Sequence, residues 1–206
     1  MPSLQEILPS LAVLILSLSF HEAAHAWAAN RLGDPTARLM GRLTLNPLAH
    51  IDWIGTVLFP LIAFVSGVPL IGWAKPVPVD LRNLRHGRRD YALVALAGPV
   101  SNLILATVAA ALFLALRASE GGYVNAGGQI LLLAILLNVL LAIFNMIPVP
   151  PLDGGNVLMG IVPLRTAHTI NWLRPYGFII IYGLMLTGVL SAIMRPVQSF
   201  LLSFLL

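Results

Sequence analysis

Residues 7–30 read ILPSLAVLILSLSFHEAAHAWAAN, an apolar run that continues without interruption into two histidines and a glutamate. One membrane pass of helix takes about 20 residues, so a helix over 4–30 is long enough to cross a bilayer. Of the 206 residues in the chain, 58% are hydrophobic and 10% are charged, and the mean hydropathy is +0.90. Soluble domains carry about 25% charged residues. The sequence therefore predicts an all-α polytopic membrane protein.

The other apolar segments complete the predicted architecture, a single membrane domain over 1–206. Core helices are expected at 4–30, 91–117 and 128–147, with a C-terminal helix at 175–194 and a short apolar tail. The apolar segment 54–74 is punctuated by glycines and prolines, which argue against a straight spanning helix. They are Gly55, Pro60, Gly67, Pro69 and Gly72. We expect this segment to form a re-entrant loop or a strand hairpin.

Charge and cysteine content exclude several classes of function. The formal net charge is +4, but the basic residues lie in short loops between apolar runs rather than in a stripe with aromatic residues. They are interpreted as topology determinants, and no nucleic-acid partner is expected. The chain has no cysteine, so a site for a soft metal would have to use histidine and carboxylate ligands.

His21, Glu22 and His25 form an HExxH motif within the first apolar helix. A spacing of four residues puts both imidazoles on one helix face, where they can bind one zinc ion, and Glu22 can take a proton from bound water. A charged residue at the centre of a membrane helix costs about 2.5–3.5 kcal/mol on insertion scales. One alternative is a helix end where polar residues meet water. The other is a haem or structural metal site, which would not need Glu22.

A catalytic zinc needs a third protein ligand and an open fourth position. Candidates are His50, His86, His168 and the few acidic residues, among which Asp153 stands out because two glycines follow it. A turn built on PPLDGG is the alternative interpretation of Asp153. His21 lies about 26 Å along its helix, and Asp153 follows the helix 128–147, so both can reach one membrane face. The basic loops then share that face, as the positive-inside rule prefers, and segment 54–74 must return to the face where it began.

Three stretches resemble the site-2 proteases, zinc metalloproteases that cut substrates within the membrane. They are FHEAAHAWAA (20–29), GPVSN (98–102) and NMIPVPPLDGG (145–155). The resemblance implies zinc ligands at His21, His25 and Asp153 and a general base at Glu22. It also implies a role in substrate or oxyanion binding for Asn145, and it matches the family's mid-helix motif to Gly98 and Asn102. From the residues alone, both asparagines are equally well explained as hydrogen bonds between helices. The length corresponds to the minimal branch, without PDZ or CBS modules.

The expected function is that of a zinc-dependent intramembrane endopeptidase with one Zn²⁺ per chain. Its expected partners are a membrane-spanning protein substrate and the lipid bilayer, with a homo-oligomer left open. The expected location is a prokaryotic cell membrane, with the active site towards the cytoplasm. A divalent-metal transporter is the alternative, but it needs polar residues across the whole membrane, and the segments 91–117 and 175–194 have few. An inactive scaffold would not need the complete set of His, Glu, His and Asp.

Overall fold

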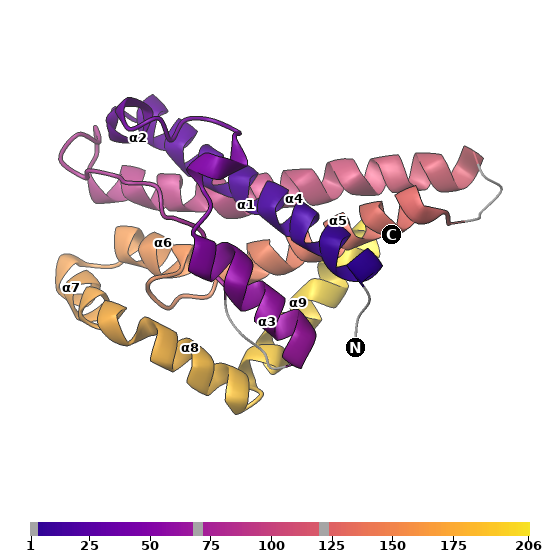
Figure 1. The fold of residues 1–206 in the computed structure, drawn as a ribbon. Coiled ribbons are helices and arrows are strands. Elements are labelled where there is room, and N and C mark those ends of the chain that lie inside the picture. The colour runs from indigo at the N-terminus through magenta and orange to yellow at the C-terminus, as the bar shows by residue number, and fades with distance from the viewer. Residues whose placement is uncertain (1–3, 68–71, 120–123) are drawn as a thin grey trace.

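The computed structural model describes residues 4–67, 72–119 and 124–206, which fold into helices with no strand in these ranges (Figure 1). The predicted all-α class is confirmed. The long helices are α1 (Leu4–Arg31), α4 (Arg88–Ser119) and α5 (Ala126–Asn145). The shorter ones are α2 (Thr36–Leu39), η1 (Pro47–Ala49), η2 (Trp53–Leu58), α3 (Phe59–Ser66), α6 (Asp153–Ile161), α7 (Leu164–Trp172), η3 (Arg174–Tyr176), α8 (Gly177–Leu186) and α9 (Val189–Leu205).

Helices α1, α4 and α5 are each long and apolar enough to cross a membrane. Helix α4 is central and contacts α1, α5 and α6. Its buried face consists largely of small residues, which let neighbouring helices approach closely: Ala92, Ala95, Gly98, Ala106, Ala109 and Ala110. Its exposed face carries large apolar side chains suited to lipid: Leu93, Val100, Ile104, Val108 and Leu112.

One end of the molecule collects the loops that carry basic residues. Helices α1 and α5 run in the same direction and α4 runs in the opposite one (Figure 1). The Arg85 N–H donates to the Leu32 carbonyl at 3.1 Å, so the chain after α1 meets the chain before α4. The Arg88 guanidinium donates to the Val162 carbonyl at 2.6 Å, which adds the connection between α6 and α7 to this end. This arrangement agrees with the expectation that the basic loops lie on one face of the membrane.

The two ends of segment 54–74 meet. The Trp73 N–H donates to the Gly55 carbonyl at 3.2 Å, and the Thr56 hydroxyl donates to the Trp73 carbonyl at 2.8 Å. The outgoing arm is the π-helix η2 followed by α3, and the return arm, 72–80, is non-helical. The strand-hairpin alternative is therefore wrong for the described part of this segment, since a helix satisfies its own backbone groups in an apolar setting. Pro69 lies outside the described residues.

The C-terminal region differs from the predicted single helix over 175–194. Helix α8 ends at Leu186, and the chain turns at Gly188, which has φ +76° and directly precedes α9, so the paths before and after it are bent by 78°. Helix α9 then continues through Pro196 to Leu205 and packs on α5, so the short apolar tail is part of a helix. Helices α6 and α7, which precede this region, were not expected from the sequence.

Candidate metal centre

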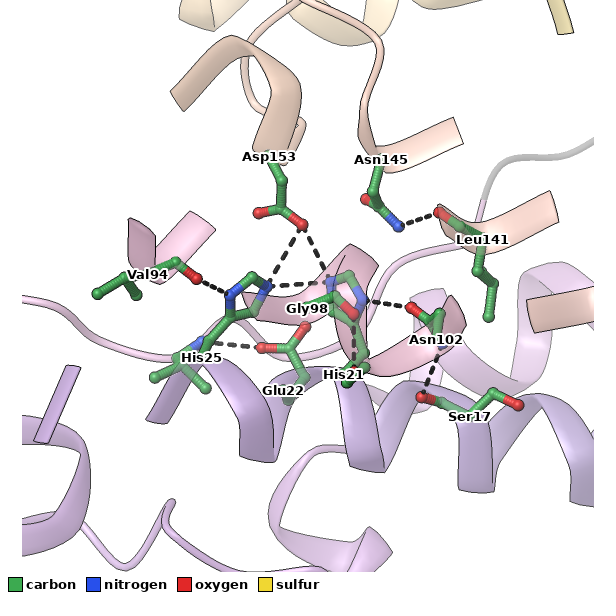
Figure 2. Close-up of polar contacts among 12 residues, drawn as sticks. Ser17, His21, Glu22, His25, Val94, Gly98, Asn102, Leu141, Asn145 and Asp153 are labelled. Atoms are coloured by element: carbon green, nitrogen blue, oxygen red, sulfur yellow. Dashed lines mark hydrogen bonds and ion pairs between the residues drawn. The ribbon is translucent and has the colours of Figure 1, made fainter. Parts of the chain in front are cut away.

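The two histidines of the HExxH motif lie on one face of α1, as their spacing predicts. Their side chains are buried, and the Nε2 atoms of His21 and His25 are 3.0 Å apart (Figure 2). The Nδ1 atom of each ring points the other way, towards a hydrogen-bond partner on α4, which fixes the orientation of the ring. The α1 face therefore presents two ring nitrogens to a single point.

Asp153 reaches this point from the other end of the sequence. It is the first residue of α6, and its Oδ2 lies 3.1 Å from His21 Nε2 and 3.3 Å from His25 Nε2. The following glycines allow this approach because a Cβ on Gly154 would lie 2.2 Å from the Met146 carbonyl oxygen. Among the described residues, these three form the one cluster of His, Asp and Glu side chains with the geometry of a metal site.

The donor set fits a zinc ion. The Val94 carbonyl, which can only accept, lies 2.7 Å from His25 Nδ1, so Nδ1 carries the proton and neutral Nε2 presents a lone pair. His21 Nδ1 makes the equivalent contact with the Asn102 side-chain oxygen at 2.6 Å. Asp153 Oδ2 is buried, and within the described ranges its only partners are the two ring nitrogens. Tetrahedral zinc with bonds of about 2.0–2.1 Å separates its donors by about 3.3 Å, close to the spacings found here.

Gly98 on α4 packs directly against both imidazoles. A Cβ at this position would lie 2.4 Å from His25 Nε2 and 2.5 Å from His21 Cε1. The resemblance matched Gly98 to the family's mid-helix motif, and the structure shows that its packing partners are the two rings. Any side chain at this position would therefore displace the candidate ligands.

The two asparagines named from the sequence occupy different environments. Asn102 is fully buried behind His21 and does not border the cavity described below. Asn145 borders that cavity, and its amide N–H₂ donates to the Leu141 carbonyl at 3.0 Å (Figure 2). The geometry favours a positioning role for Asn102, whereas Asn145 is placed where it can contact a substrate.

Glu22 is buried beside the two histidines, and its Oε2 accepts a hydrogen bond from the Val77 N–H at 3.2 Å. Val77 belongs to the return arm, 72–80. Arg42 holds this arm by donating to the carbonyls of Lys75 and Pro76, and it also donates to the Ala49 carbonyl. Sequence patterns assigned Arg42 to membrane topology alone, because nothing local indicated that its guanidinium is buried.

A cavity of about 640 Å³ joins these groups. It is bordered by α1, the return arm, α4, α5, α6 and the start of α8. Its polar lining residues are His21, Glu22, His25, Tyr91, Asn145, Asp153, Asn156 and Arg174. The ligand triad and Glu22 thus open onto one space of the size of typical small-molecule sites.

The remaining histidines lie apart from this cluster. His50 is buried and its Nε2 contacts the Thr44 carbonyl at 2.9 Å, whereas His86 lies beside Asp90 at 3.3 Å. His168 is exposed on α7. None of these three joins the metal cluster found among the described residues.

Comparisons with known proteins agree on one family. The description "Peptidase family M50" matches residues 121–187, which include Asp153. "Putative zinc metalloprotease YwhC" of Bacillus subtilis is 37% identical over 198 residues, covering 94% of this chain and 87% of that protein. "Putative zinc metalloprotease Rip2" of Mycolicibacterium smegmatis is 31% identical over 184 residues, covering 88% of this chain and 68% of that protein. No solved structure matches the chain.

Proposed function

The chain belongs to peptidase family M50, the site-2 protease family of zinc metalloproteases, and we propose that it cuts membrane-spanning segments of other proteins within the bilayer. The observation that carries this proposal is the convergence of His21, His25 and Asp153 beside Glu22 in one cavity. This cavity lies among helices long enough to cross a membrane. A soluble peptide would not require such a location for the site.

The proposed ligands for one zinc ion per chain are His21, His25 and Asp153. Zinc in this position supplies Lewis-acid chemistry and makes water more acidic. Glu22 then acts as the general base: it takes a proton from the attacking water and passes it to the leaving amine. The Val77 N–H fixes one carboxylate oxygen of Glu22, which leaves the other oxygen for proton transfer. The Asn145 side chain, at the cavity border, is proposed to hydrogen-bond the substrate backbone.

The substrate must unwind before it is cut, because an intact helix uses its carbonyls in hydrogen bonds to residue i+4. An unwound substrate can bind as an added strand to an exposed backbone edge, and segment 54–74 is the candidate for such an edge. The return arm offers few donors for such pairing. Pro76 and Pro78 have no N–H, and the N–H groups of Lys75 and Val77 already bond His50 and Glu22. We propose that the part of this arm that borders the cavity, within residues 72–79, contacts substrate mainly through carbonyls and side chains.

The active site is proposed to face the cytoplasm of a prokaryotic cell. The basic loops 31–42 and 75–89 meet at one end of the helices, where Arg88 also contacts the connection that follows α6, the helix that begins with Asp153. Basic loops prefer the cytoplasmic side. This orientation can be tested by labelling a cysteine introduced in place of Arg82, which is exposed. In intact cells a membrane-impermeant reagent will not label this cysteine if its loop lies in the cytoplasm.

Cleavage by the Glu22→Gln variant is the experiment that tests the proposed activity. Reconstituted protein would be mixed with single-span substrates tagged at both ends, with zinc content measured in parallel. The variant is expected to retain zinc and to lose cleavage, since glutamine cannot accept the proton. Asp80→Asn is the matched control, because Asp80 pairs with Arg82 near the surface and such pairs contribute about 0–1 kcal/mol. Cleavage by the glutamine variant would refute the proposal, and zinc flux without cleavage would favour the transporter.

A further inference from the structure

Behind His21 lies a chain of buried amides that joins α1, α4 and α5. The Asn102 N–H₂ donates to the Asn138 side-chain oxygen at 2.8 Å. The Asn138 N–H₂ donates to the Ser17 hydroxyl and to the Ala134 carbonyl, both at 2.9 Å. Asn102, Asn138 and Ser17 are at most 3% exposed, so water does not compete for these bonds.

The Ala134 carbonyl fixes the direction of this chain. A backbone carbonyl can only accept, so the end of Asn138 that faces it must be the N–H₂ group. The Asn138 oxygen then faces Asn102 and requires an N–H₂ group there. As a result, the Asn102 oxygen faces His21 Nδ1, which must carry the ring proton, and Nε2 is left with a lone pair towards Asp153.

We propose that Asn138 is a positioning residue of the metal centre, which acts through Asn102 to keep His21 Nε2 free to bind zinc. The inference rests on the proposed zinc site. His25 needs no such relay, because the Val94 carbonyl accepts from its Nδ1 directly. His21 instead depends on two side-chain amides. The Asn102 N–H₂ also donates to the Ser17 carbonyl, but at 3.4 Å this contact is longer than the 2.8 Å bond to Asn138 and holds Asn102 less firmly.

A purely structural role is the competing explanation, since asparagines commonly hold membrane helices together. The two roles differ in the property that the variants change. A positioning role requires Asn102, so removing Asn138 has no further effect on zinc affinity once Asn102 is replaced. A purely structural role would lower the thermal stability of each variant and leave its zinc affinity unchanged, and because Asn102 and Asn138 bond each other their stability losses need not add.

Zinc affinity, measured by chelator competition, tests the relay in Asn138→Leu, Asn102→Leu and the double variant. Loss of an outer partner of a ligating histidine typically lowers metal affinity about 10–100-fold. We expect a loss in this range for Asn138→Leu and no larger loss in the double variant than in Asn102→Leu. Ser17→Ala is the matched control: it keeps the Ala134 contact and should change affinity by less than about threefold. Unchanged affinity in Asn138→Leu, or additive losses, would overturn the inference.

The position of the His21 ring proton in the zinc-loaded wild-type protein provides a readout that does not depend on any variant folding. Nitrogen NMR shifts of the imidazole show which ring nitrogen carries the proton. The expected result is a proton on Nδ1, bonded to the Asn102 oxygen, and a proton on Nε2 would overturn the proposed relay. A wild-type protein that binds no zinc would instead refute the metal centre itself, so the two failures are distinguishable.

Discussion

Replacing Gly98 with alanine is expected to weaken zinc binding strongly while leaving the helices folded. The added Cβ would lie 2.4 Å from His25 Nε2 and 2.5 Å from His21 Cε1. Non-bonded heavy atoms are most stable at about 3.5–4.0 Å, so each ring would have to retreat by about 1 Å. Metal–ligand distances hold to within about 0.2 Å, and a displacement of this size can cost about 100-fold. We expect zinc affinity to fall by at least this factor.

The assay is zinc content of purified protein after dialysis against a chelator, with circular dichroism to monitor helicity. Gly183→Ala is the matched control, because a Cβ at this position on α8 meets no atom within 4 Å. Alanine is favoured over glycine inside a helix by about 1 kcal/mol, so this control should keep its zinc and its stability. Wild-type zinc affinity in Gly98→Ala would show that the rings do not occupy the positions described.

Two further predictions concern the loops that support the site. Asp34 accepts hydrogen bonds from Thr36, Asn83 and the Asp80 N–H, so Asp34→Ala should destabilise the fold by about 2 kcal/mol in thermal melts. Burial raises the pKa of Asp34, but these bonds more than offset it and leave the pKa below its ordinary 3.8. The stabilisation is therefore present above pH 3.8 and is lost as the pH falls through the lower pKa of the folded state. If the wild-type protein remained more stable than Asp34→Ala below that pKa, the ionised carboxylate would not be the source of the stabilisation. Arg42→Met should release the return arm and lower the cleavage rate at least about tenfold, with zinc retained. The control is Arg38→Met, a change at an exposed arginine that should leave the rate unchanged. Equal cleavage rates for the two variants would show that the arm is held by other contacts.

Local sequence signals accounted for the long helices. The apolar runs placed α1, α4 and α5 within three residues at every boundary, because length and hydrophobicity alone decide whether a segment can span a membrane. The same apolar runs did not predict the bend at Gly188 or the helix α6. The PPLDGG stretch is typical of a turn, but its last three residues begin α6, where Gly154 packs on the backbone just after α5 and Gly155 packs on Val149 and Pro150.

The candidate site was predicted in part. The HExxH spacing placed His21 and His25 on one face because helical periodicity is local. Asp153 lies far from both histidines in the sequence, so its approach to them could be predicted only from helix lengths and loop charges. Asn138 and Arg42 were not identified, since an amide inside an apolar helix and an arginine in a basic loop carry no local sign of their partners. Their roles depend on contacts between segments distant in sequence.

The zinc content of the Asp153→Ala variant tests the central claim most directly, namely that α1 and the start of α6 hold one cation together. Purified wild-type protein is expected to contain one zinc ion per chain, and the variant, dialysed in the same way, is expected to lose it. An unchanged zinc content in the variant would contradict the claim, because the carboxylate would then not be the third ligand.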